Sequence, residues 1–209
     1  MSAKDVLHRY LDECPLIAIV RGVIPDEAEA TAQAVYDGGI RIIEVPLNSP
    51  DPLESIRRIA TKFGDRMLVG AGTVVDPGQV ERVRDSGGRL VVAPNTDTRV
   101  IAAAAGAEMV SCPGYFTPSE AFVGWHAGAT ALKLFPAEAA TPSVLKALLA
   151  VVPKDVPQIV VGGISPHNMQ PWLEAGATGF GLGSGLYKPG QSAAATLDKA
   201  RAYVAGLKA

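Results

Sequence analysis

The chain of 209 residues is long enough for one domain with a large buried core. Its net charge of −2, without a basic block, indicates neither a nucleic-acid partner nor an anionic membrane surface, and no apolar run reaches the length of a membrane span. Residues 1–14 are charged and amphipathic, unlike a signal peptide, and the two cysteines lie far apart without metal-ligand spacing. These features predict a cytoplasmic protein with reduced thiols that binds no nucleic acid and no membrane.

The predicted elements repeat one pattern along the chain: a helical segment ends near a glycine or proline, and a short apolar strand follows. An extra helix at residues 2–13 precedes the first strand, and a closing helix is expected at about residues 192–207. The strands are expected at residues 16–20, 41–45, 67–71, 89–93, 108–111, 129–134, 158–161 and 179–182. Apolar strands that alternate with helices are typical of a parallel sheet, because its strands are buried on both faces.

This order of elements favours an α/β fold that closes as a single (β/α)8 TIM barrel with an extra N-terminal helix. No change in composition marks a second domain, so we expect one barrel domain over residues 1–209, with the helix at 1–14 and the barrel at 15–209. A doubly wound open sheet is the alternative, but the glycine-rich dinucleotide-binding motif is missing after the first strand.

Lys133 is the charged residue of an apolar strand, between Leu132 and Leu134. Burying an unpaired ammonium group is costly, and a desolvated lysine can lose its proton near neutral pH. The neutral amine is the nucleophile of Schiff-base chemistry. The alternatives are a lysine paired with a carboxylate, or a side chain that snorkels out of the strand end.

Glu44 stands near the end of the second strand, and the active sites of TIM barrels form at this end of the strands. We expect its carboxylate to share one cavity with Lys133. In that cavity Glu44 either transfers protons with a shifted pKa or only neutralises the lysine.

Two glycine-rich loops follow the seventh and eighth strands. Gly162 and Gly163 precede a Ser-Pro pair at residues 165–166, which is typical of the N-cap and first residue of a helix. Gly183 and Ser184 repeat this design in the next unit, with Ser184 expected to open a short helix. The backbone N–H groups of these two loops commonly bind phosphate in TIM barrels, which predicts a phosphorylated small-molecule substrate.

The other strand ends supply further candidates. Arg21 either binds a substrate carboxylate bidentately or forms a salt bridge at the barrel rim. Thr73 either donates a hydrogen bond to the substrate or caps the next helix. Pro94 and Phe135 are expected to wall the cavity, and Cys112 to act as a small buried hydrophobe. The remaining histidines and tryptophans are expected on helices, solvated or packed: His8, His126, His167, Trp125 and Trp172.

Taken together, the strand-end motifs resemble those of a known family, over almost the whole chain from about Pro15 to the final helix. The segments are Glu44-Val-Pro-Leu-Asn-Ser-Pro50, Gly70-Ala-Gly-Thr73, Pro94-Asn95, Lys133-Leu-Phe-Pro136, Val161-Gly-Gly163 and Gly183-Ser184. They are similar to the motifs of the class I 2-keto-3-deoxy-6-phosphogluconate aldolase family. The resemblance implies a Schiff-base lyase of carbohydrate metabolism that needs no metal or other cofactor and forms a homotrimer.

Two branches of that family differ near these motifs. Gluconate-type enzymes usually carry Glu-Val-Thr-Leu-Arg-Thr after the second strand and a Thr before the Gly-Gly of the seventh strand. Here the first segment is Glu44-Val-Pro-Leu-Asn-Ser49, Val161 stands before the Gly-Gly, and Ile19-Val-Arg-Gly22 ends the first strand. These features are similar to the branch that acts on 2-dehydro-3-deoxy-6-phosphogalactonate in galactonate degradation. Arg21 would then replace the cation missing at Asn48, and Val161 would relax or invert the discrimination between C4 epimers.

The resemblance implies that Lys133 attacks the C2 ketone, while Glu44, directly or through water, transfers protons as pyruvate and D-glyceraldehyde 3-phosphate are released. The catalytic residues are therefore expected to be Lys133 and Glu44. The substrate-binding residues are expected to be Arg21, Thr73, Pro94, Phe135, Val161, Gly162, Gly163, Gly183 and Ser184. The nearest alternatives are 2-dehydro-3-deoxy-6-phosphogluconate and 4-hydroxy-2-oxoglutarate aldolase activity. A phosphosugar epimerase or isomerase, or a non-catalytic barrel that binds sugar phosphates, is more distant.

Overall fold

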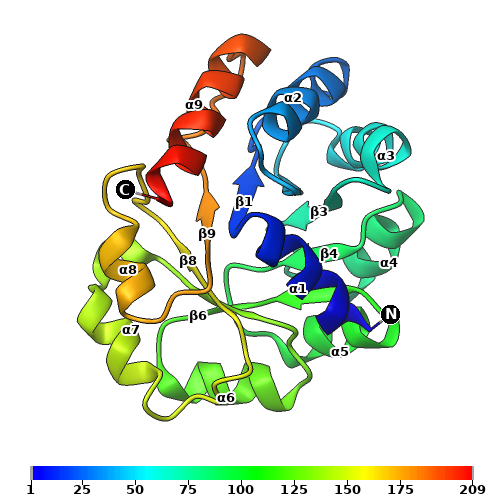
Figure 1. The fold of residues 1–209 in the computed structure, drawn as a ribbon. Helices are drawn as coiled ribbons and strands as arrows, with labels where there is room; N and C mark the ends of the chain where they lie inside the picture. The colour runs from blue at the N-terminus through cyan, green and yellow to red at the C-terminus, as the bar shows by residue number, and fades with distance from the viewer. Residues whose placement is uncertain (1, 209) are drawn as a thin grey trace.

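The structure, a computed structural model, describes residues 2–208 and forms a barrel of parallel strands surrounded by helices (Figure 1). The strand order is β5-β4-β3-β2-β1-β9-β8-β7-β6. The strands are β1 (Leu16–Ile19), β2 (Ile42–Pro46), β3 (Leu68–Gly72), β4 (Leu90–Val92), β5 (Val110–Cys112), β6 (Gly114–Tyr115), β7 (Leu132–Leu134), β8 (Gln158–Val161) and β9 (Gly179–Leu182). The predicted TIM-type barrel is confirmed.

The barrel closes through two short strands, β5 and β6, on either side of Pro113, and β6 lies beyond the strand expected at residues 108–111. Strand β5, before the proline, pairs with β4, and β6, after it, pairs with β7. Proline has no N–H to donate, so a ladder is interrupted where it stands. The backbone N–H of Lys133 nevertheless donates to the carbonyl of Pro113 at 2.9 Å, which joins the two halves of the wall.

Apart from α1, the helices form a ring outside the strands (Figure 1). The helices of the described chain are α1 (Ala3–Glu13), α2 (Pro25–Asp37), α3 (Pro52–Phe63), α4 (Pro77–Asp85), α5 (Thr98–Gly106), α6 (Pro118–His126), α7 (Pro142–Leu148), α8 (Gln170–Glu174) and α9 (Ala193–Gly206), with a 3-10 turn η1 at Ala137–Ala139. Several begin with a proline, whose fixed φ suits the first helical turn and whose missing N–H is not needed there. No helix in the described part of the chain is long and apolar enough to cross a membrane.

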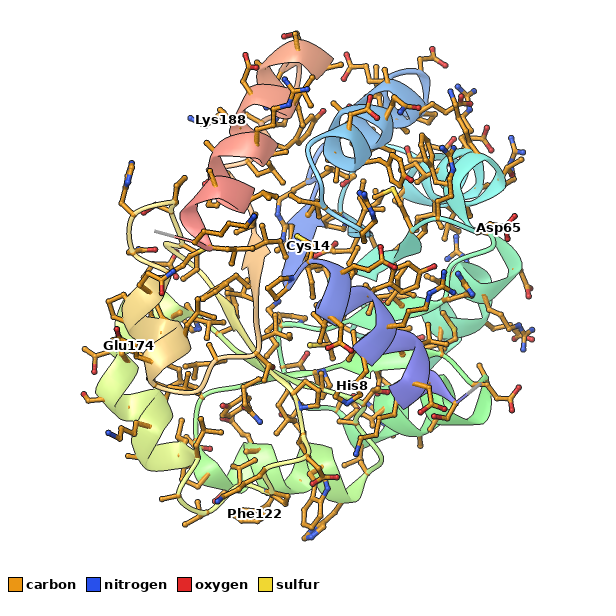
Figure 2. The ribbon with its side chains drawn as sticks, viewed as in Figure 1. His8, Cys14, Asp65, Phe122, Glu174 and Lys188 are labelled. Carbon is orange, nitrogen blue, oxygen red and sulfur yellow. The ribbon has the colours of Figure 1, made fainter. Side chains whose placement is uncertain are left out.

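Helix α1 lies across the end of the barrel where the strands begin (Figure 1). Its side chains Leu7, Tyr10 and Leu11 belong to the same buried cluster as the residues inside the barrel. Figure 2 shows His8 on this helix and Cys14 just beyond it. Because α1 covers this end, an active site has room only at the opposite end, where the strands finish.

Most strand boundaries differ from the prediction by one or two residues, and three differences concern the segments near the expected site. The sixth strand is shorter than residues 129–134, since β7 begins at Leu132. Ser165 is not the N-cap of a helix: its N–H donates to Asn168 Oδ1 at 2.8 Å in a local turn, and α8 begins only at Gln170. Ser184 opens a turn and not a short helix. The segments that begin at Ser165 and Ser184 can therefore bind an anion through the N–H groups of loops, and not through the N-terminus of a helix.

Candidate active site

Glu44 and Lys133 both project into the barrel near the end of their strands. Side chains alternate along a strand, and Ile42 and Ala131, each two residues earlier, belong to the cluster inside the barrel. Glu44 is 2% exposed and Lys133 is 7% exposed. The prediction that the two share one cavity agrees with their electrostatics, since each affects the pKa of the other.

The carboxyl group of Glu44 is poised between its two protonation states near neutral pH. Burial raises its pKa from 4.5 to about 7, against the opposing attraction of Lys133 and Arg21. Oxygen Oε2 is buried and has no hydrogen-bond partner among the described residues. A buried carboxyl oxygen without a partner is costly, so this atom is ready to accept or donate a proton at a bound molecule.

Lys133 is not held by a direct ion pair. Burial lowers the pKa of its ammonium group, and the carboxyl group of Glu44 offsets this only in part. Among residues 2–208, no carboxylate forms an ion pair with its Nζ, which lies 4.5 Å from the ring centroid of Phe135. Neither the paired nor the snorkelling alternative fits this buried lysine.

Substitution of Glu44 by glutamine should stabilise the protein at pH 8. A carboxyl pKa raised on folding means that the folded state binds the proton more tightly, so stability falls as pH rises from about 4.5 to 7. Glutamine cannot ionise, and the rise in pKa corresponds to an upper limit of about 3 kcal/mol in the free energy of unfolding. Lost attraction to Lys133 will reduce this gain.

Urea unfolding of both proteins at pH 4 and pH 8 measures the difference directly. The free energy of unfolding of Glu44→Gln, relative to that of wild type, should be greater at pH 8 than at pH 4. If the variant is less stable than wild type at pH 8 by the same margin as at pH 4, burial does not raise the pKa of this carboxyl group.

Arg21, Asn48 and Thr73 gather at the mouth, from the loops after β1, β2 and β3. Nη1 of Arg21 donates to Oδ1 of Asn48 and approaches Oγ1 of Thr73 at 3.4 Å. No ion pair involves Arg21 among the described residues, so the rim salt bridge is absent there. Asp76 caps α4 itself by accepting from Gly78 N–H at 2.8 Å, which leaves Thr73 free of that role. The guanidinium group of Arg21 thus lies beside Asn48.

The glycine-rich loops after β8 and β9 present unpaired donors. Within residues 2–208, no protein group accepts from the backbone N–H of Gly162, Gly163, Gly183 or Ser184. Gly162 and Gly163 have φ of 117° and 64°, a left-handed region that favours glycine. Successive N–H groups in such conformations form a concave anion site.

The walls of the cavity combine residues from several strands. Phe135 lies beside Lys133, and Val161 is buried in the cluster inside the barrel. Pro94 follows β4 and is half-buried. Cys112 also lies inside, where burial raises the pKa of its thiol to about 12, which agrees with an inert hydrophobe. The exposed His126 and His167 do not belong to this cluster.

Glu138 is a neighbour of the site that the sequence did not reveal. It stands on η1, and a Cβ built on Gly162 would lie within 3.0 Å of its carboxyl group. The Gly162-Gly163 pair therefore makes room for this side chain as well as for backbone donors. Only the three-dimensional contact between two loops exposes that relation, since nothing in the spacing of the residues predicts it.

The whole chain is similar to known aldolases. The family model of KDPG and KHG aldolases matches residues 7–201. The 2-dehydro-3-deoxy-6-phosphogalactonate aldolase of Escherichia coli K12 is 48% identical over 94% of this chain and 96% of its own. The KHG/KDPG aldolase of the same strain is 31% identical over 81% of this chain and 79% of its own. A solved native KDPGal structure matches with a TM-score of 0.92 at 47% identity, over 94% of this chain and 95% of that one. A barrel with a buried lysine and glutamate at its open end, matched over nearly its full length, places this chain in the KDPG and KHG aldolase family.

Proposed function

We propose that this protein is a class I aldolase that cleaves 2-dehydro-3-deoxy-6-phospho-D-galactonate to pyruvate and D-glyceraldehyde 3-phosphate. The observation that carries the proposal is the buried Lys133 facing the cavity with Glu44, without an ion pair between them. The greater identity to the phosphogalactonate enzyme than to the KHG/KDPG enzyme of the same organism supports the choice of substrate.

The cleavage is a sequence of balanced proton and electron-pair transfers. Glu44 takes the ammonium proton of Lys133, and the neutral amine adds to the C2 ketone. Glu44 then gives this proton to the carbinolamine hydroxyl, which leaves as water and gives an iminium ion. Glu44, directly or through water, takes the proton of the C4 hydroxyl. The C3–C4 bond then breaks, its electron pair forms an enamine, and D-glyceraldehyde 3-phosphate leaves. Protonation of the enamine at C3 and hydrolysis of the iminium release pyruvate and restore Lys133.

The two ends of the substrate fit the two polar ends of the cavity. Arg21 and Thr73 bind the C1 carboxylate, since the guanidinium group of Arg21 lies beside Asn48 and Thr73 at the mouth. The phosphate binds to the N–H groups of the two loops after β8 and β9, at Gly162, Gly163, Gly183 and Ser184. Phe135, Pro94 and Val161 wall the space between. Phosphate binding far from the reacting carbons would position C2 at Lys133.

The function is tested by measuring, in a coupled assay, the release of pyruvate from 2-dehydro-3-deoxy-6-phosphogalactonate and from its C4 epimer, 2-dehydro-3-deoxy-6-phosphogluconate. We expect faster cleavage of the galactonate epimer, and borohydride with substrate should attach the carbon skeleton of pyruvate to the protein. Faster cleavage of the gluconate epimer, or of 4-hydroxy-2-oxoglutarate, would assign the chain to the other branch. No pyruvate and no trapped adduct would favour an epimerase or isomerase.

Substitution of Val161 by threonine should move the preference between epimers toward the gluconate substrate by about 3- to 10-fold in the ratio of kcat/KM. The threonine hydroxyl supplies one hydrogen bond near C4, and one such bond contributes about 1 kcal/mol. The change is nearly isosteric, so Val161→Ala serves as the control for altered packing. An equal ratio in wild type and Val161→Thr would remove Val161 from the selectivity.

The assembly and location of the enzyme complete the proposal. We place it in the cytoplasm as a homotrimer with a single barrel domain, on the family resemblance, the buried free thiols of Cys14 and Cys112, and the exposed apolar side chains of Phe116 and Val123. Sedimentation velocity tests the trimer, which would have three times the chain mass of 21.7 kDa.

A further inference from the structure

Gly72, the last residue of β3, lies directly beneath the carboxyl group of Glu44. A Cβ built on Gly72 has Oε1, Cδ and Oε2 of Glu44 as its three nearest heavy atoms, all closer than 3.0 Å. Real Cβ atoms essentially never make such contacts. The carboxyl group of Glu44 therefore packs against the Cα of Gly72, and any side chain at position 72 would overlap with this carboxyl group.

The backbone at Gly72 cannot move away to relieve this contact. It pairs with Pro46 in the ladder between β2 and β3, and its carbonyl accepts the N–H of Leu47 at 2.8 Å. Its φ lies outside the left-handed region, so alanine is conformationally allowed there. Contact with Glu44 is thus the feature that a methyl group at position 72 would disturb.

The neighbouring glycine of the same strand has a different reason for its small size. Gly70 is directly opposite Glu44 in the ladder, but a Cβ there would strike the backbone carbonyl of Leu90. Gly70 is required by the approach of β3 to β4. Gly72 differs because the three atoms nearest to its side-chain position all belong to the carboxyl group of Glu44.

We infer that Gly72 is a positioning residue that makes room for the carboxyl group of Glu44 against β3 and so fixes its distance from Lys133. This inference rests on the proposed function, in which Glu44 transfers protons to and from the substrate. A methyl group at position 72 would displace the carboxyl group by about 1 Å or more, and a misplacement of that size can reduce a rate by about 10²-fold.

A double-mutant cycle between Gly72→Ala and Glu44→Ala tests the inference through pyruvate release. Gly72→Ala alone should lower kcat by about 10²-fold with little change in KM, because the substrate contacts are intact. In the Glu44→Ala background the same change should have no further effect, since no carboxyl group remains to be displaced. A further loss of about 10²-fold in the double variant would show that Gly72 acts on the barrel and not through Glu44. Gly106→Ala, at the end of α5 with open space around it, is the matched control.

Thermal unfolding of the same four proteins tests the contact without relying on activity. Gly72→Ala should lower Tm in the wild-type background and leave it unchanged in the Glu44→Ala background. If Gly72→Ala does not fold but the double variant does, the contact with Glu44 is equally supported. Equal decreases of Tm in both backgrounds would overturn the inference. A wild type that releases no pyruvate from either epimer would refute the proposed function, whereas the Tm cycle would still decide whether Gly72 and Glu44 are coupled.

Discussion

Replacement of Lys133 by methionine should lower kcat for pyruvate release by at least about 10⁴-fold, because the covalent route through an iminium ion is lost. Methionine matches the length of the buried stem, so the barrel interior keeps its packing. Removal of a desolvated amine, whose pKa burial has already lowered, should leave the protein at least as stable at neutral pH. Pyruvate release and thermal unfolding measure the two effects.

Borohydride reduction in the presence of pyruvate distinguishes loss of the nucleophile from loss of the fold. Wild type should gain the mass of one reduced pyruvate, and Lys133→Met should gain none. Lys146→Met, on the exposed side of α7, is the matched control and should be trapped and active like wild type. Trapping of Lys133→Met at another lysine, with activity retained, would assign the Schiff base elsewhere.

The barrel could be predicted from the sequence because its signal is local and repeated. Apolar strands buried on both faces, each followed by a helix, permit few arrangements other than a parallel sheet. The predicted boundaries of helices and strands were wrong where a single residue or hydrogen bond determined the local structure. The Ser-Pro pair at 165–166 has the residue types of a helix start, but the side chain of Asn168 accepts the N–H of Ser165 and holds a turn instead. Pro113 likewise separates β5 from β6, a short strand that the prediction, which ended at residue 111, did not include.

The site could be predicted in its residue types but not in its contacts. Lys133 was recognisable because a charge in an apolar strand is unusual, and Glu44 because it ends an apolar strand. The hydrogen bond between Arg21 and Asn48 joins two loops, and the contact of Glu138 with Gly162 joins two others. Such relations depend on the stagger of the strands around the barrel, which a single sequence does not encode in any local pattern. Glycine shows the limit most clearly, since only the structure separates Gly70, which faces a backbone, from Gly72, which faces a carboxyl group.

Substitution of Glu44 by glutamine should lower kcat by about 10²- to 10⁴-fold, the usual contribution of a positioned acid or base. Wild-type kcat/KM should fall as pH decreases through about 7, because the burial-raised pKa of Glu44 leaves its carboxyl group protonated there and unable to take the C4 hydroxyl proton. Glutamine cannot ionise, so this dependence on pH should disappear in the variant. Measurement of kcat/KM from pH 5 to pH 9 in both proteins checks both effects.

Borohydride trapping separates the role of Glu44 from that of Lys133. The Glu44→Gln variant keeps its nucleophile, so it should still be trapped with pyruvate, only more slowly, because carbinolamine dehydration lacks its proton donor. Glu174→Gln, on α8 in the outer ring (Figure 2), is the matched control and should keep the activity and pH profile of wild type. If the dependence near pH 7 persists in Glu44→Gln, another group titrates there. Burial raises the pKa of Cys112 to about 12, and the group would then be Lys133, whose pKa burial lowers, or a group on the substrate or at the mouth.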